Sequence, residues 1–144
     1  MGGAAGMTER SGKCLCGAVT VRATPEPHVS ACHCTMCRRW GGSAYMVVDC
    51  GTEVAFEGGP ITRFRSSDWA ERGFCATCGT HLFYYLVPRG SYFMPAGLFD
   101  EQAGLSFVSE IYIDRKPDWY AFAGERTRQT EAEFLASIGA GGEG

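Results

Sequence analysis

Residues 32–39 read Cys-His-Cys-Thr-Met-Cys-Arg-Arg, which places three thiols within six positions and two arginines directly after them. Two further pairs of thiols flank this stretch: Cys14 and Cys16 lie upstream, and Cys75 and Cys78 lie downstream. Closely spaced thiols serve in metal binding, in disulfides or in redox chemistry. The choice among these three uses decides both the fold class and the function class of the chain.

The rest of the sequence favours metal binding. The chain has 144 residues, eight of them cysteine, and a formal net charge of −3. It shows no signal peptide at its N-terminus and no apolar run near the roughly 20 residues of a membrane span. We therefore expect a cytoplasmic protein with no membrane partner, whose reduced thiols favour metal over disulfides. The weak acidity argues against nucleic acid as a partner, because such binding needs a basic face.

Length and composition predict one domain with a packed core, since hydrophobic residues make up 45% of the chain. Residues 1–10 begin with a run of glycine and alanine and are expected to form a flexible leader. Residues 11–139 are expected to form the single zinc-binding domain, and residues 140–144 a flexible tail.

Alternation of apolar and polar residues predicts a mainly β fold of short strands joined by glycine-rich turns. Two stretches are expected to be helical, and the first is a turn or two over residues 35–40. The second covers residues 130–138, where Thr130 caps the helix and Glu133 follows three positions later, as in a capping box. The predicted strands are residues 18–23, 29–31, 44–48, 53–57, 61–66, 81–87, 91–98 and 106–113.

Cys14, Cys16, Cys75 and Cys78 lie on two short knuckles, each followed by a glycine that permits a tight turn. Two thiols one or two residues apart on such a turn can face the same ion. Two turns from distant parts of the chain then complete a tetrahedron of soft ligands, which suits zinc. We expect a structural zinc ion here. Buried free cysteines are the alternative, but these occur singly rather than in pairs.

Cys32, Cys34 and Cys37 differ in number, because three close ligands leave one coordination position open to water, hydroxide or an incoming thiolate. An open position is typical of catalytic zinc, so these thiols are the candidate catalytic residues. Two alternatives stay open: Cys50 closes the site as a fourth ligand, or the three thiols form a redox cluster. His33 is expected to point away from the ion, because neighbouring side chains on a strand face opposite sides.

The cysteines belong to longer motifs: Gly-x-Cys-x-Cys-Gly-x-Val at residues 12–19, Cys-His-Cys-x-x-Cys-Arg at 32–38, Arg-Phe-x-Ser-Ser at 63–67 and Arg-x-Phe-Cys-x-x-Cys-Gly-x-x-Leu at 72–82. This order of motifs resembles the glutathione-dependent formaldehyde-activating enzyme family. Later blocks at residues 97–100 and 111–120 extend the resemblance to Tyr120. One departure is Glu110, where the family pattern leads us to expect a histidine.

The resemblance implies a β-tent fold of several short, coiled antiparallel sheets stapled by zinc, with one C-terminal helix. The family's activity joins glutathione and formaldehyde to give S-hydroxymethylglutathione, in the carbon–sulfur lyase class. Two zinc ions per chain are implied, one structural and one catalytic. Their ligands would be Cys14, Cys16, Cys75 and Cys78 for the structural ion and Cys32, Cys34 and Cys37 for the catalytic ion.

The expected partners are glutathione or another small thiol, and a small aldehyde. Zinc lowers the pKa of a bound thiol and, as a Lewis acid, polarises a carbonyl. Arg38 and Arg39 are candidate substrate-binding residues, since a guanidinium holds a carboxylate by paired hydrogen bonds; the alternative is ordinary surface charge. Two other function classes stay open, namely a non-catalytic zinc module that binds a partner protein and a thiol-based redox or metal sensor.

Overall fold

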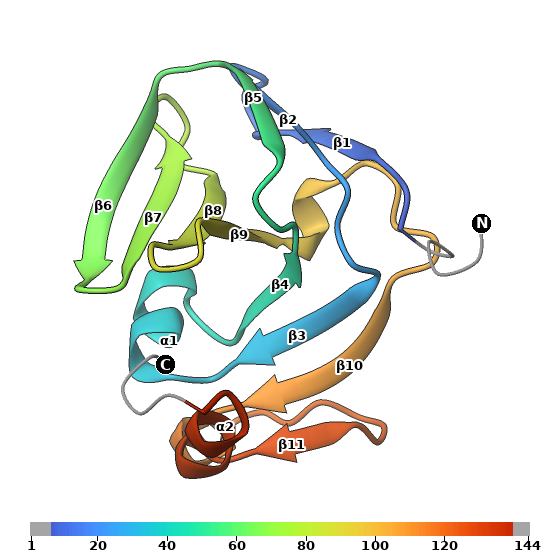
Figure 1. Ribbon diagram of the computed structural model, residues 1–144, viewed down its shortest axis with the longest axis vertical. Helices are drawn as coiled ribbons and strands as arrows, with labels where there is room; N and C mark the ends of the chain where they lie inside the picture. The colour runs from blue at the N-terminus through green and yellow to red at the C-terminus, as the bar shows by residue number, and fades with distance from the viewer. Residues whose placement is uncertain (1–6, 140–144) are drawn as a thin grey trace. The chain divides into compact units, whose positions relative to one another are not determined.

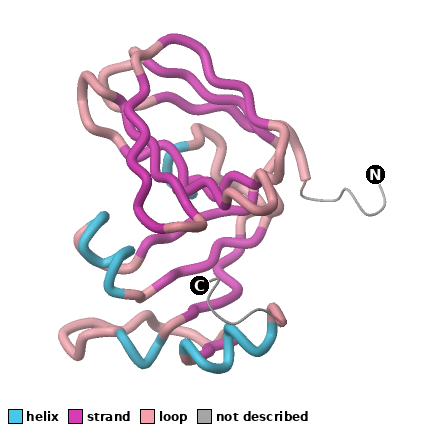
Figure 2. Tube along the Cα trace, turned by 60° about the vertical axis from the view of Figure 1, so that its left-hand side comes forward, coloured by secondary structure: helices cyan, strands magenta, loops and turns pink. Residues whose placement is uncertain are grey.

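The computed structural model describes residues 7–139, in which β-strands predominate and two short α-helices occur (Figure 1). The mainly β class predicted from the sequence is therefore confirmed, and the colouring of Figure 2 makes the predominance of strand visible. Residues 1–6 and 140–144 lie outside the described part, so most of the predicted leader and the whole predicted tail fall there. Arg10, the last residue of the predicted leader, begins a strand and is buried.

The chain forms two compact units, each assembled from two separate stretches of sequence. Among the described residues, the first unit contains residues 7–28 and 47–105, and the second contains residues 29–46 and 106–139. Each group of clustered thiols lies wholly within one unit. The single domain over residues 11–139 stays a prediction.

The first unit contains a three-stranded antiparallel sheet with β2 in its middle. In β2 the side chains of Val19, Val21 and Ala23 are buried, whereas the intervening ones are exposed. This alternation is the pattern that predicted the strand, because successive side chains of a strand face opposite sides. The strands are β1 (Arg10–Lys13), β2 (Val19–Ala23) and β5 (Val54–Gly58).

The same unit contains an antiparallel meander, which can be followed from β6 to β9 in Figure 1. Residues 47–49 of a further strand, β4, pair antiparallel with the last strand of this meander. A 3-10 helix at Ala96–Leu98 ends β9 earlier than predicted. The strands are β4 (Tyr45–Asp49), β6 (Ile61–Ser67), β7 (Ala70–Cys75), β8 (His81–Leu86) and β9 (Ser91–Pro95).

Phe83 lies at the centre of the core of this unit and is fully buried. Its ring packs against those of Phe56 and Tyr92, with centroids 5.4 Å and 5.2 Å away. Gly73 on β7 permits this packing, because a Cβ at that position would lie 2.2 Å from the Phe83 ring. The aromatic residues therefore join the meander to β5, which carries Phe56.

The second unit contains three strands in the order β11-β10-β3, namely β3 (His28–Cys32), β10 (Ser106–Ile111) and β11 (Thr127–Gln129). β10 and β11 pair in parallel, whereas antiparallel sheets were expected. The crossover between them is long enough to permit it, since parallel strands need a dozen or more intervening residues. β10 ends before the predicted limit because Tyr112 adopts a left-handed backbone conformation with φ 59°.

Both predicted helices belong to the second unit, as α1 (Thr35–Gly41) and α2 (Glu131–Ser137). The predicted capping box of α2 is confirmed. Thr130 Oγ1 accepts from the Glu133 N–H at 3.2 Å, and Glu133 Oε1 accepts from the Thr130 N–H at 2.8 Å. No helix in the described part of the chain has the length and apolar character needed to cross a membrane.

Candidate metal centres

Four thiols of the first unit converge, with their sulfur atoms all within 4.8 Å of one another. We call them the first cluster: Cys14, Cys16, Cys75 and Cys78. Each pair lies on a turn closed by a backbone hydrogen bond, from Gly17 to the Cys14 carbonyl at 3.0 Å and from Gly79 to the Cys75 carbonyl at 2.8 Å. Both glycines have φ near +80°, a conformation that strains other residues. The two predicted knuckles thus meet as the sequence indicated.

Hydrogen-bond donors point at the sulfurs of the first cluster. The Val19 N–H donates to Cys14 Sγ at 3.3 Å, and the Cys78 N–H donates to Cys75 Sγ at 3.5 Å. Hydrogen bonds from the side chain and backbone of Thr80 lower the pKa of the Cys78 thiol to about 5. Donors of this kind stabilise thiolates, which are the form that binds metal. The donor set and its surroundings therefore fit a closed tetrahedral zinc site.

Three thiols of the second unit form the second cluster, again with all sulfur atoms within 4.8 Å: Cys32, Cys34 and Cys37. They lie where β3 gives way to α1, since Cys32 ends the strand and Cys34 is the N-cap of the helix. Cys34 Sγ accepts a hydrogen bond from the Cys37 N–H at 3.3 Å. Hydrogen bonds from the Cys32 and Cys37 thiols lower the pKa of the Cys34 thiol, although burial opposes them. The cluster therefore favours a thiolate at Cys34 and offers three ligands to a metal.

Cys50 belongs to neither cluster found among the described residues. It is buried in the first unit, where its thiol donates to the Val48 carbonyl oxygen at 3.7 Å. Burial, with the neighbouring charge of Asp49, raises the pKa of the Cys50 thiol to about 12. Its surroundings favour the protonated thiol over the thiolate that a metal ligand requires.

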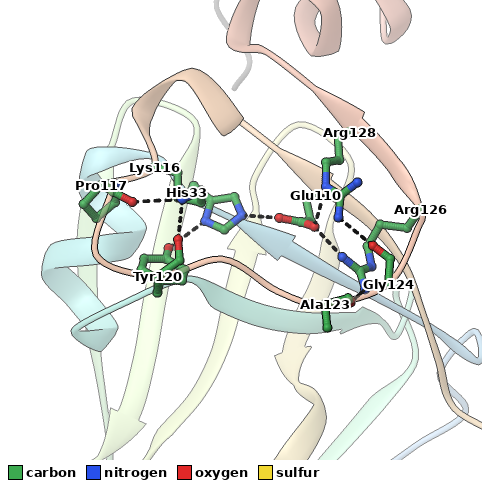
Figure 3. Close-up of polar contacts among 9 residues, drawn as sticks. All are labelled: His33, Glu110, Lys116, Pro117, Tyr120, Ala123, Gly124, Arg126 and Arg128. Atoms are coloured by element: carbon green, nitrogen blue, oxygen red, sulfur yellow. Dashed lines mark hydrogen bonds and ion pairs between the residues drawn. The ribbon is translucent and has the colours of Figure 1, made fainter.

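His33 lies between two thiols of the second cluster, but both of its ring nitrogens are engaged elsewhere (Figure 3). Nδ1 is 2.7 Å from the Tyr120 hydroxyl, and Nε2 is 2.9 Å from Glu110 Oε1. The ring is fully buried. No ring nitrogen is left to bind a metal, which agrees with the expectation that His33 points away from the ion.

Glu110 is the residue of this region that sequence reasoning singled out only as a departure from a pattern. Its carboxylate is buried, and Oε2 accepts hydrogen bonds from Arg126 at 2.6 Å and from Arg128 Nε at 3.1 Å. Burial raises the pKa of the carboxyl, but the hydrogen bonds from His33 and Arg126 and the charge of Arg128 outweigh it and leave the pKa lowered. The substitution for an expected histidine was the one available signal of this arrangement.

Arg38 and Arg39 both lie in the last turn of α1. Arg38 is half-buried and directly follows Cys37, whereas Arg39 is exposed. Neither guanidinium forms an ion pair with another described residue. Both charges are therefore available to an anionic ligand near the second cluster, and Arg38 is the better placed in sequence.

Comparisons with known proteins agree with this arrangement. The sequence model of the glutathione-dependent formaldehyde-activating enzyme family matches residues 9–115. An uncharacterized lyase of Schizosaccharomyces pombe is 38% identical over 135 residues, which make up 92% of this chain and 98% of that protein. A crystal structure of a Rhodobacter sphaeroides protein is similar with a TM-score of 0.55 and 21% identity, over 62% of this chain and 87% of that one. At that identity the structural likeness concerns the fold alone.

Proposed function

The chain belongs to the glutathione-dependent formaldehyde-activating enzyme family, and from this premise we propose that it is a zinc-dependent enzyme of the carbon–sulfur lyase class. Its substrates are a small thiol, with glutathione as the leading candidate, and a small aldehyde such as formaldehyde. The observation that carries the proposal is the second cluster, which gathers three thiols and leaves a coordination position for a substrate. A cytoplasmic location and the β-tent description of the fold belong to the same proposal.

The two clusters take different parts. The four thiols of the first cluster would hold a structural zinc ion, and the three of the second would hold a catalytic one. When bound at the second cluster, zinc supplies a Lewis acid that favours the thiolate form of an incoming thiol and polarises a carbonyl. The reaction forms a bond between the thiol sulfur and the aldehyde carbon, and the thiol proton ends on the aldehyde oxygen.

Arg38 provides the binding contact that selects the thiol. Its guanidinium directly follows a thiol of the second cluster and has no ion-pair partner among the described residues. A carboxylate of glutathione is the complementary group, because a guanidinium and a carboxylate form two parallel hydrogen bonds. Arg39, exposed in the same turn, adds positive charge to the approach.

The test uses the protein with cobalt in place of zinc. Binding of glutathione should intensify the sulfur-to-cobalt charge-transfer band, and binding should strengthen as the pH rises and the thiol deprotonates. Arg38→Ala should weaken glutathione binding by roughly one to two decades, the effect of losing a charge-assisted hydrogen bond. A small thiol that lacks carboxylates is the matched control and should bind the variant and the wild type equally.

Two results would count against the proposal. A protein that holds two metal ions but shows no spectral change with any thiol would support the alternative of a non-catalytic zinc module. A protein that binds thiols yet forms the formaldehyde adduct no faster than buffer does would have another carbonyl substrate. The second measurement needs the uncatalysed rate as its reference, because thiols and formaldehyde combine readily.

A further inference from the structure

Five side chains of the second unit form a polar network centred on two buried residues, which we call the Glu110 network: His33, Glu110, Tyr120, Arg126 and Arg128 (Figure 3). Glu110 is 2% exposed and His33 is fully buried. A buried carboxylate is destabilising unless it is paired and hydrogen-bonded. Hydrophobic residues of similar volume often fill such a space with equal or better stability, so stability alone is a weak explanation of the network.

The network holds His33, which lies in sequence between two candidate metal ligands. His33 is fixed at three points, because its backbone N–H donates to the Ile111 carbonyl at 3.1 Å and both ring nitrogens have partners. Its neighbours in sequence are Cys32 and Cys34 of the second cluster. Because the backbone and ring of His33 are held, the Cα–Cβ bonds of Cys32 and Cys34 are held in direction as well.

The partners of His33 are themselves held. Lys116 Nζ donates to the Pro117 carbonyl at 3.0 Å and also to the Tyr120 carbonyl, which secures the loop that carries the Tyr120 hydroxyl (Figure 3). The Arg128 guanidinium donates to the Gly124 carbonyl at 2.8 Å as well as to Glu110. Each member therefore has at least two contacts, and the network is a rigid support.

Three members of the network lie beyond the family match. That match ends at residue 115, whereas Tyr120, Arg126 and Arg128 follow it. The network thus extends from the part of the chain that the family model covers into the part that follows it.

We propose that the Glu110 network positions Cys32 and Cys34 for metal binding at the second cluster, so that Glu110 and Tyr120 act on the site through His33. The inference rests on the proposed function in one respect, since it requires the second cluster to hold a metal. Outer contacts that orient ligands typically change metal affinity by about 10–100-fold when removed. Without the network, metal binding would itself have to order the segment that carries Cys32 and Cys34, and this cost would lower the metal affinity.

The test measures metal affinity at the two clusters of one protein. Glu110→Gln keeps the size of the side chain but removes its charge and one of its two acceptors. We expect the affinity of the second cluster for zinc, measured by competition with a chromophoric chelator, to fall about 10–100-fold. The first cluster, in the other unit, serves as the internal reference and should be unchanged. The cobalt ligand-field spectrum of the second cluster should change in shape as well, because the ligand geometry is relaxed.

Glu131→Gln is the matched control. It removes a carboxylate from the same unit. Glu131 Oε1 pairs with the exposed Arg115 at 2.9 Å, and the Glu131 side chain is far less buried than that of Glu110. This variant should bind metal at both clusters as the wild type does. Tyr120→Phe is the second test variant, and it carries the test if Glu110→Gln does not fold. It removes only the hydroxyl next to His33 Nδ1, and we expect about a tenfold loss at the second cluster alone.

The outcomes separate this inference from the proposed function. A wild type that holds two metal ions, with Glu110→Gln and Tyr120→Phe unchanged in second-cluster affinity and cobalt spectrum, would overturn the positioning role and leave the proposed function standing. Lower stability without any change in these two readouts would overturn it equally, because it would show a purely structural role. A wild type that holds no metal at the second cluster would overturn both.

Discussion

The Leu15 N–H donates a hydrogen bond of 3.0 Å to Thr80 Oγ1, although the two residues lie 65 positions apart. The same hydroxyl lies 3.1 Å from Cys78 Sγ. Thr80 thus joins the upstream knuckle of the first cluster to the downstream one and also contacts a candidate ligand. The two knuckles are held together by protein contacts in addition to any metal.

Thr80→Val should weaken metal binding at the first cluster. Valine keeps the branched shape of threonine but removes the hydroxyl, so the Leu15 N–H and Cys78 Sγ both lose a partner. We expect the zinc affinity of the first cluster to fall by about tenfold in a chelator competition. Thr52→Val is the control, because the Thr52 hydroxyl is exposed and, within residues 7–139, its one hydrogen bond is to the neighbouring Glu53. Equal first-cluster zinc affinities in Thr80→Val and Thr52→Val would show that the Thr80 hydroxyl does not contribute to metal binding.

Cys78→Ser should unfold the protein more easily and remove one metal equivalent. Metal binding free energy at a structural site is folding free energy, because the unfolded chain has no preformed site. We expect the free energy of unfolding to fall by about 4 kcal/mol or more, the range reached when a structural metal is lost. Chemical denaturation and metal analysis measure the two effects. A variant with full metal content and unchanged melting would exclude this set of ligands.

Cys34→Ser should remove one metal equivalent and leave cooperative unfolding in place. The second cluster has the open position of a functional site, and such sites need not contribute to stability. Denaturation curves of Cys34→Ser and Cys78→Ser measured together decide the matter. If Cys34→Ser were as unstable as Cys78→Ser, the structural and catalytic assignments would have to be exchanged.

Cys50→Ser should leave the metal content at two ions per chain. The Cys50 thiol donates to a backbone carbonyl and has a pKa raised to about 12, so it is disposed to stay protonated. Metal analysis of the purified variant is sufficient. A loss of metal would mean that Cys50 is a fourth ligand and that the second site is closed to substrate.

The features that could be predicted from the sequence are those with a local signal. The knuckles at Cys14 and Cys75 depend on cysteine spacing and a following glycine, and the capping box at Thr130 depends on two residues three positions apart. The alternation of β2 gives its buried face directly. In each case the physical cause lies within a few residues, so the sequence was enough.

The features that could not be predicted depend on distant partners. β7 has no clear alternation, because Arg72 is buried there and Gly73 yields its space to the Phe83 ring. β11 is a three-residue strand that gains its structure by pairing with β10. His33 and Glu110 are 77 positions apart, and neither position indicates the other. Tertiary packing determines these strands and this contact, and no local sequence pattern indicates it.

Glu110 should make the protein sensitive to acid. Its folded-state pKa is lowered below the ordinary value of 4.5: burial raises it, but the hydrogen bonds from His33 and Arg126 and the charge of Arg128 outweigh burial. The unfolded chain therefore takes up a proton at this residue first as the pH falls. The stabilisation that the carboxylate provides is complete above the unfolded-state pKa and is lost as the pH falls through the folded-state pKa.

Glu110→Gln should remove this part of the acid sensitivity. We expect the free energy of unfolding of the wild type to fall more steeply than that of the variant as the pH is lowered from about 5 to about 3. Both proteins are compared in a Cys34→Ser background, in which the second cluster holds no metal, so that protonation of the first-cluster thiolates is common to both and cancels in the difference between the two curves. Denaturant titrations at a series of pH values give that difference. Parallel curves would mean that the folded protein does not prefer the ionised carboxylate, and the account of Glu110 as the charged acceptor of two arginines would fail.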